Sequence, residues 1–311
     1  MIPTGLRPTC ILIHQFTGHQ DAIYSLEASG DGKTFFSASG DGMIIRWSLE
    51  HPDNGEVIAR IESSVYSMAY NPGTDLLAVG KNNDGIHGFH PGSGKPAGSL
   101  HTGPVQIFDI CFHQGQLLTA SGDGMLRVIN PVNWTILNEI QVSGKSLRCI
   151  ATHPDNGPIA VGCSDNRIYR FDPVTLQRLD DWEAHGNSVF SLAYGSEGDV
   201  LYSGSRDARI RTWTTGPNGI RSVETAAHLF TVNHIAFRAD GKHFLTCSMD
   251  KTIKIWSSGM SPQLQRVLDR ARHGGHSSSV NRLCRINEDT FASAGDDRCI
   301  NIWKFKPAES Q

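Results

Sequence analysis

Short stretches in which apolar and polar residues alternate recur along the whole chain, separated by turns rich in glycine, asparagine, aspartate and proline. Residues 61–100 contain four such stretches, and these occupy Val65–Tyr70, Leu76–Val79, Ile86–Phe89 and, more weakly, Pro96–Leu100. A period of two between tight turns predicts short antiparallel strands, and no segment shows sustained helical periodicity. The pattern therefore predicts a four-stranded antiparallel meander as the local unit.

This unit is repeated. A bulky apolar residue closes its third stretch and recurs at intervals of 42, 40, 42, 42, 43 and 47 residues. The seven residues are Trp47, Phe89, Ile129, Phe171, Trp213, Trp256 and Trp303. A unit of this length cannot bury its own apolar faces, so the units must pack side by side. Seven such units are too many strands for one open sheet, and we predict an all-β fold, a seven-bladed propeller around a central channel.

The repeats run without interruption from about residue 18 to residue 305, which predicts a single domain over residues 1–311. The last unit ends at Phe305 with three strands, so its outer edge would be unpaired. Residues 10–17 include the apolar segment Ile11–Phe16 and are the natural fourth strand. We therefore predict that an N-terminal strand completes the last blade and closes the ring.

A polar set accompanies the repeats. A histidine precedes an aspartate by 22 residues in four units and by 21 in a fifth, and a serine or threonine lies four residues before each aspartate. Both loops should emerge at the same end of a blade, and a buried imidazole needs partners for both nitrogens. In units two and four, Ile61 and Ser143 replace the histidine, and Val79 and Val161 replace the hydroxyl. We predict five structural networks, made by His19, Ser37, Asp41 and Trp47; by His101, Thr119 and Asp123; by His185, Ser203, Asp207 and Trp213; by His228, Thr246, Asp250 and Trp256; and by His276, Ser293, Asp297 and Trp303.

These features resemble those of WD40-repeat proteins over residues 10–305. The sequence has Gly-His openings at Gly18-His19 and Gly275-His276, and Ser-x-Ser-x-Asp runs at residues 37–41 and 203–207. The Trp-Asp dipeptide itself is absent, and only Phe171-Asp172 approaches it. The resemblance implies a seven-bladed propeller that serves as a non-catalytic interaction scaffold.

The resemblance also implies that partners bind at the end that carries the histidine loops, through residues at fixed offsets from the histidine and the aspartate. Carried over position by position, the partner-binding residues are Tyr24, Tyr66, Asn82, Gln106, Arg148, Phe190, Arg206, Asn233, Met249, Asn281 and Asp296. Aromatic, methionine and arginine side chains are enriched at interface centres, so a protein or peptide partner is expected. The alternative is that these aromatics only fill the channel mouth.

Two other functions remain open as alternatives. Serine, histidine and aspartate within hydrogen-bonding reach would suit a hydrolase, but five copies favour a structural role, and no enzyme is predicted. A propeller hydrolase with a channel metal would need hard ligands from several first strands, where the compared positions offer Asn233 and Asn281. A weak nucleic-acid site could use the alternating Arg206, Arg209 and Arg211. We predict no cofactor and no metal.

The overall composition further limits the classes of partner and the compartment that can be expected. Lys plus Arg number 28 and Asp plus Glu number 31, so the net charge of -3 gives no general attraction for nucleic acid or an anionic membrane. The seven cysteines are odd in number and never form a CxxC pair, which is typical of a reducing compartment rather than of a disulfide framework or zinc site. The chain shows no signal-peptide pattern and no membrane-length apolar run. We expect a cytoplasmic protein, either a monomeric ring or a subunit of a larger complex.

Overall fold

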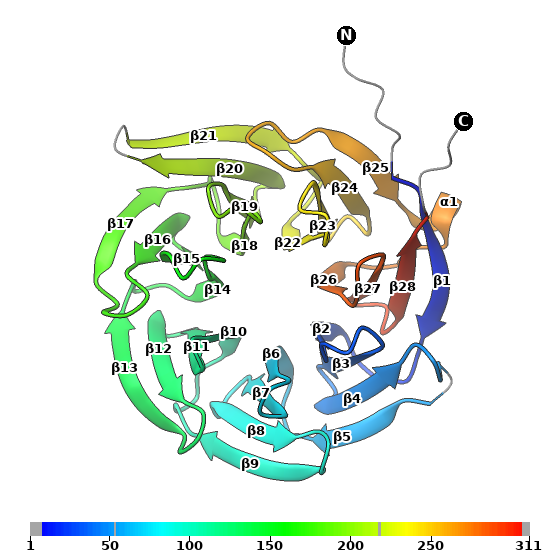
Figure 1. The fold of residues 1–311 in the computed structure, drawn as a ribbon, viewed down its shortest axis with the longest axis horizontal. Coiled ribbons are helices and arrows are strands. Elements are labelled where there is room, and N and C mark those ends of the chain that lie inside the picture. The colour runs from blue at the N-terminus through cyan, green and yellow to red at the C-terminus, as the bar shows by residue number, and fades with distance from the viewer. Residues whose placement is uncertain (1–7, 53, 217–218, 307–311) are drawn as a thin grey trace.

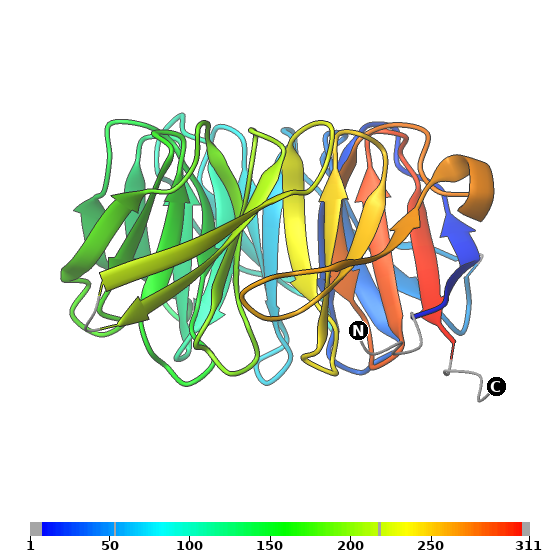
Figure 2. The same cartoon turned by 90° about the horizontal axis from the view of Figure 1, so that it is seen from above.

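The computed structural model describes residues 8–52, 54–216 and 219–306, and these form seven four-stranded antiparallel sheets around a central axis (Figure 1). The predicted all-β propeller with seven blades is confirmed. Seen from the side, the molecule is a flat disc whose loops emerge at two opposite faces (Figure 2). Each blade runs from an inner strand at the channel to an outer strand at the rim.

The first three blades follow one another in chain order. Blade 1 contains β2 (Ile23–Ala28), β3 (Thr34–Ser39), β4 (Met43–Ser48) and β5 (Glu56–Arg60). Blade 2 contains β6 (Val65–Asn71), β7 (Leu76–Lys81), β8 (Ile86–His90) and β9 (Lys95–Leu100). Blade 3 contains β10 (Ile107–His113), β11 (Gln116–Ser121), β12 (Met125–Asn130) and β13 (Thr135–Gln141).

Blades 4 to 6 have the same layout. Blade 4 contains β14 (Leu147–Ala151), β15 (Ile159–Cys163), β16 (Arg167–Phe171) and β17 (Arg178–Glu183). Blade 5 contains β18 (Val189–Tyr194), β19 (Leu201–Ser205), β20 (Arg209–Gly216) and β21 (Gly219–Ala226). Blade 6 contains β22 (Val232–Phe237), β23 (His243–Ser248), β24 (Ile253–Ser257) and β25 (Leu264–Leu268), and the short helix α1 (Arg270–His273) follows it.

Blade 7 joins the two ends of the chain. It contains β26 (Val280–Arg285), β27 (Thr290–Gly295) and β28 (Ile300–Phe305), and its outer strand is β1 (Cys10–Phe16). Strand β1 runs antiparallel to β28, with Cys10 opposite Phe305 and Phe16 opposite Ile300. The predicted closure of the ring by the N-terminal strand is therefore confirmed. Phe16 also packs against Trp47 of blade 1 at 5.1 Å between ring centroids, so the same strand ties the last blade to the first.

The core lies between neighbouring blades rather than in one central mass. One cluster of buried side chains contains Phe35 and Trp47 of blade 1 together with Ala292 and Ile302 of blade 7. Because each sheet is covered on both faces, the second strand of each blade is almost continuously buried, as β15 is throughout its length. The second stretch of each repeat accordingly consists mostly of apolar and small residues.

Trp134 makes an additional contact between blades. It lies in the turn between β12 and β13 and packs its indole into blade 2, where its Nε1 donates to the Ala97 carbonyl at 3.2 Å. A Cβ atom at Gly88 or Gly98 would lie 2.1 or 2.2 Å from this ring, so only glycine leaves room for it. This contact of Trp134 with blade 2 therefore depends on two glycines in the outer half of the neighbouring sheet.

Candidate functional site

The loops that precede the inner strands and the loops between second and third strands share one end of the disc, called here the top face. Four of the five predicted networks are present there. In blade 5, His185 Nδ1 lies 3.0 Å from Asp207 Oδ2, and its Nε2 lies 2.8 Å from Ser203 Oγ. Ser203 Oγ also accepts the indole N–H of Trp213 at 2.8 Å. The same contacts recur in blade 1 at His19, Ser37, Asp41 and Trp47; in blade 6 at His228, Thr246, Asp250 and Trp256; and in blade 7 at His276, Ser293, Asp297 and Trp303.

Protonation in these networks follows from the partners. An ionised carboxylate can only accept, so the histidine Nδ1 carries the hydrogen and Nε2 accepts from the hydroxyl. Burial lowers the pKa of His19 and His228, which keeps these rings neutral. Burial alone would raise the pKa of Asp207, but hydrogen bonds from His185 and from backbone N–H groups lower it to about 2. In blades 1 and 6 the network is thus a neutral histidine held between a hydroxyl and a carboxylate.

The network predicted from His101, Thr119 and Asp123 is wrong. His101 is exposed, and its Nδ1 lies 2.7 Å from Asp84 of blade 2. Asp123 instead pairs with Arg127, at 2.6 Å between Oδ2 and Nη2, and Thr119 Oγ1 is buried without a hydrogen-bond partner among the described residues. No tryptophan is available either, because the terminal position is Ile129.

The error has a geometric cause. His101 lies six residues before its inner strand begins at Ile107, whereas His19 lies four residues before Ile23. The hairpin that follows in blade 3 is correspondingly shorter, because β10 and β11 are joined by a tight turn between His113 and Gln116. The two differences cancel, so a spacing of 22 residues survives although the histidine has been moved out of position. Gly103 stands four residues before the inner strand, where blades 1, 5, 6 and 7 place histidine.

The same two-residue difference in the entry loop changes the position assigned to Gln106. The carbonyl of Gln106 accepts the Gly122 N–H at 2.8 Å, as the carbonyl of Ala22 accepts the Gly40 N–H at 2.8 Å. Gln106 therefore occupies the position of Ala22 rather than that of Tyr24. Phe108 is the residue of blade 3 that matches Tyr24, and counting from the inner strand instead of from the histidine would have found it.

A curved row of side chains, called here the aromatic arc, lines the channel mouth over blades 1 to 5. It consists of Tyr24, Tyr66, Phe108, Arg148 and Phe190, each partly exposed. Ring centroids lie 5.0 Å apart for Tyr24 and Tyr66 and 5.8 Å apart for Tyr66 and Phe108. The guanidinium carbon of Arg148 lies 4.1 Å from the Phe108 centroid and 5.3 Å from that of Phe190. The structure thus brings four of the predicted side chains together through one that was missed.

The remaining predicted residues have different surroundings. Asn233 donates to the Val280 carbonyl at 2.8 Å, and Asn281 donates to Asp296 Oδ1 at 2.7 Å and to the Ile23 carbonyl at 3.1 Å. Both amides therefore link neighbouring blades. Asn82 is partly exposed on blade 2, and Arg206 and Met249 are exposed on blades 5 and 6. Leu229 and Phe230, which follow His228 and are also exposed, were not predicted.

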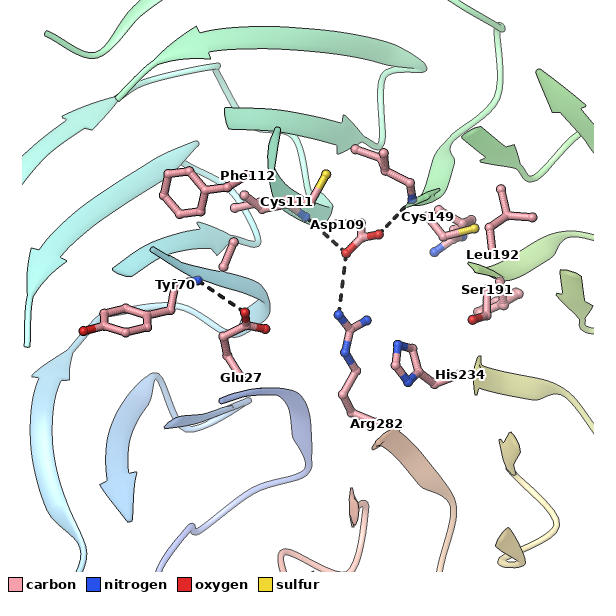
Figure 3. Close-up of a pocket in the computed structure, with 15 residues that line it drawn as sticks. Glu27, Tyr70, Asp109, Cys111, Phe112, Cys149, Ser191, Leu192, His234 and Arg282 are labelled. Carbon is pink, nitrogen blue, oxygen red and sulfur yellow. Dashed lines mark hydrogen bonds and ion pairs between the residues drawn. The ribbon is translucent and has the colours of Figure 1, made fainter. Parts of the chain in front are cut away.

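Below the arc, the channel wall carries a charged cluster of Glu27, Asp109, His234 and Arg282 that lines a cavity of about 310 Å³ (Figure 3). Arg282 reaches across the channel so that its Nη2 lies 3.8 Å from Asp109 Oδ1. Asp109 Oδ2 accepts the Ile150 N–H at 2.8 Å, and Glu27 Oε1 accepts the Tyr70 N–H at 3.4 Å.

Burial decides the charge state of this cluster. It raises the pKa of Asp109 and raises that of Glu27 to about 7, with Arg282 opposing the shift in both cases. Burial also lowers the pKa of His234 well below its ordinary value, which leaves the ring neutral. Both carboxylates lie further along the inner strands than the positions nearest the mouth, and so they were not among the predicted residues.

Neither alternative function gains a site from this geometry. Within the described residues, no group of three histidine, cysteine or acidic side chains, the channel cluster included, is arranged so that it could hold a metal ion. Arg209 and Arg211 both pair with Glu224, at 2.6 Å and 2.9 Å, so the alternating arginines do not form a free basic stripe with Arg206. In the part of the chain that the structure describes, no helix has the length and apolar character to cross a membrane.

Comparison with protein families identifies the repeats. Residues 10–48, 176–214, 220–257 and 267–304 match the model of the WD domain, G-beta repeat. The chain is a WD40-repeat protein. The first three matched segments each cover the outer strand of one blade and the first three strands of the next, as residues 10–48 cover β1 to β4, whereas residues 267–304 begin near the end of β25 and cover β26 to β28. The four matches end in blades 1, 5, 6 and 7, which are the blades with a complete histidine network.

Two curated relatives share low sequence identity with this chain. The WD40 chain is 23% identical over 300 residues to the 66 kDa stress protein of Physarum polycephalum and 24% identical over 298 residues to actin-interacting protein 1 of Caenorhabditis elegans. These alignments cover 93% and 92% of this chain but 47% of each relative, so the chain spans about half the length of the curated relatives it matches. The crystal structure of the WD40 β-propeller domain of Doa1 superposes with a TM-score of 0.81 at 20% identity, covering 96% of this chain and 97% of that one. The likeness shows the fold.

Proposed function

We propose that this WD40 propeller is a non-catalytic scaffold that binds a protein or peptide partner on its top face. The observation that carries the proposal is the aromatic arc, in which aromatic rings and Arg148 pack into one continuous and partly exposed row at the channel mouth. Tyrosine and arginine dominate the energetic centres of interfaces, and rings that already pack together lose little freedom on binding. WD40 propellers are typically protein-interaction scaffolds, and one relative is named actin-interacting protein 1.

The histidine networks support a structural rather than a catalytic role. In each network the hydroxyl that would act as nucleophile is fully buried, with 0% exposure for Ser37, Ser203 and Ser293. Ser203 Oγ also accepts the Trp213 indole hydrogen, so it faces the protein interior and not a substrate. A nucleophile needs access to substrate and a nearby oxyanion hole. Fixing two loops of a blade is the role that this geometry supports.

The test is affinity capture from cells of the source organism with immobilised wild-type protein and with the triple variant Tyr66→Ala, Phe190→Ala, Arg206→Ala. We expect the triple variant to lose the captured partner while its melting temperature stays close to that of the wild type. The matched control is Val132→Ala with Val174→Ala, two exposed residues in turns at the opposite face. Capture that survives the triple variant, or that is lost in the control, would place the site elsewhere.

Location and assembly state belong to the same proposal. A cytoplasmic location is supported by seven cysteines that are all free thiols, five of them buried. Every blade is complete within one chain, so a monomeric ring is the expected state in isolation. Light scattering of the purified protein tests the second point, and microscopy of a tagged protein in its own cell tests the first.

A further inference from the structure

Charges on the top face are segregated. Lys145, Arg206 and Lys251 are exposed on blades 4, 5 and 6, and within the described ranges none of them lies in an ion pair. Exposed carboxylates occupy the other side, with Asp21 on blade 1, Glu62 before blade 2 and Asp296 on blade 7. Exceptions are Arg60, at the end of β5, and Arg298 on the acidic side, and the carboxylate of Glu183, which is exposed at the end of β17 on blade 4. The half over blades 4 to 6 is called here the basic half.

The basic half also carries exposed apolar side chains. Leu229, Phe230 and Met249 are 83%, 56% and 55% exposed, and all three belong to the two top loops of blade 6. The loops are fastened to each other, because the Met249 N–H donates to the Thr231 carbonyl at 3.2 Å and the Leu229 N–H donates to Asp250 at 3.1 Å. Three large apolar side chains on a fixed surface indicate a contact site more strongly than singly scattered ones do.

Two carboxylates in the top loops of blades 5 and 6 are already engaged. Asp207 and Asp250 accept hydrogen bonds from His185 and His228 and from backbone N–H groups, and both are largely buried. They reduce the net charge of the basic half but do not offer a competing ion pair to Arg206. The side chains that a partner meets first are therefore basic and apolar.

Building on the proposed top-face function, we propose that the basic half binds an acidic segment of a partner protein that also carries large apolar side chains. Its carboxylates would pair with Arg206 and Lys251, while its apolar side chains would cover Leu229, Phe230 and Met249. Asp21, Glu62 and Asp296 would repel the same segment, which restricts it to one side of the channel mouth. A nucleic acid fits less well, since phosphates offer nothing to the apolar side chains and the whole chain has a net charge of -3.

The test uses a display library of short random peptides, selected on the immobilised intact protein at physiological salt. We expect the enriched sequences to be net negative and to contain phenylalanine, tryptophan or leucine. Synthetic copies should lose about tenfold or more in affinity for the variant Arg206→Glu with Lys251→Glu. They should bind the matched variant Glu62→Gln with Asp21→Asn as well as or better than the wild type. Three results would overturn the inference. They are selected peptides that are net basic or uncharged, a library that shows no enrichment, and unchanged affinity of the peptides for the Arg206 and Lys251 variant.

One further variant separates this inference from the proposed function. Tyr24→Ala with Tyr66→Ala alters the aromatic arc outside the basic half. If the library instead selects basic peptides and these lose affinity for the Tyr24 and Tyr66 variant, the top face is the docking surface but the proposal of an acidic partner is wrong. If the selected peptides bind the Arg206 and Lys251 variant and the Tyr24 and Tyr66 variant as tightly as they bind the wild type, both the acidic partner and the top-face site are refuted. If a single-stranded oligonucleotide displaced the selected peptides at physiological salt, the ligand of the basic half would be nucleic acid rather than an acidic protein segment.

Discussion

Arg282 of blade 7 and Asp109 of blade 3 face each other across the central channel, with 3.8 Å between Nη2 and Oδ1 (Figure 3). Replacement by Arg282→Met would leave Asp109 and Glu27 without the positive charge that opposes their protonation. We expect a loss of about 1–3 kcal/mol, less than the about 3–5 kcal/mol typical of a close buried pair, because the charges do not touch. Urea denaturation measures the change. The double variant with Asp109→Asn should cost less than the sum of the single variants, and strict additivity would show that the two side chains are not coupled.

Glu27 should make stability depend on pH. Burial raises its folded-state pKa to about 7, so the folded protein holds a proton that the unfolded chain releases at lower pH. The free energy of unfolding therefore falls as pH rises between the unfolded-state and folded-state pKa values. Glu27→Gln lacks this titration, and it should gain about 1–3 kcal/mol over the wild type between about pH 5 and about pH 8.

Urea denaturation of both proteins across that range checks the expectation for Glu27. Asp109, His234 and Arg282, the other charged or titratable members of the channel cluster, are identical in the two proteins and largely cancel in the difference. Glu62→Gln, which alters an exposed carboxylate of the top face, is the control and should give a flat difference. A flat difference for Glu27→Gln as well would contradict the assignment.

His185 and His101 should differ sharply although they occupy similar places in the repeat. His185→Ala strands a buried hydroxyl and a carboxylate, so we expect a cost of about 1–3 kcal/mol. His101 is exposed and contacts Asp84 at the surface, so His101→Ala should change stability by about 0.5 kcal/mol or less. Chemical denaturation of the two variants side by side measures the contrast. Equal effects would mean that the hydrogen bonds of His185 contribute little.

The contrast between these histidines also shows what could be read from the sequence. The spacing of the terminal residues from Trp47 to Trp303 was sufficient for the fold, because each blade must bury its apolar strands against two neighbours. Residues 10–17 were assignable as the closing strand because the last repeat lacks one. The histidine networks of blades 1, 5, 6 and 7 followed from the need of a buried ring for two partners.

Prediction from residue spacing was wrong in blade 3, where two changes of loop length cancel. In blade 3, a longer entry loop and a shorter hairpin kept His101 at the expected distance from Asp123 while moving it away in space. The channel cluster was missed for another reason, since Arg282 meets Asp109 across the ring and no pattern within one repeat reports contacts between distant blades. The top-face residues Leu229 and Phe230 are exposed, so no burial pattern identified them.

The indole of Trp134 and the backbone at Gly98 are in contact so close that a side chain cannot be added. Gly98 has φ 150°, and a Cβ there would lie 2.2 Å from the ring. We expect Gly98→Ala to cost about 1–3 kcal/mol by overpacking, and Trp134→Ala to cost about 3–5 kcal/mol by leaving a cavity. Gly144→Ala, whose Cβ would meet nothing within 4 Å, is the control and should be nearly neutral. In the Trp134→Ala background, Gly98→Ala should become milder, and an unchanged cost would rule out the clash.

Removal of residues 1–17 should open the ring. It deletes strand β1, uncovers the hydrogen-bonding edge of β28 and takes Phe16 away from Phe35 and Trp47. We expect a sharp drop in melting temperature, together with association through the exposed edge, which calorimetry and light scattering would record. Within β1, Phe16→Ala should cost about 3–5 kcal/mol, whereas Ile13→Ala, at a position 46% exposed, should cost about 0.5 kcal/mol or less. A synthetic peptide of residues 8–17 added to the truncated protein should restore much of the lost stability, because it can re-form the antiparallel pairing with β28. Truncated protein that melts like the full chain would contradict closure by this strand.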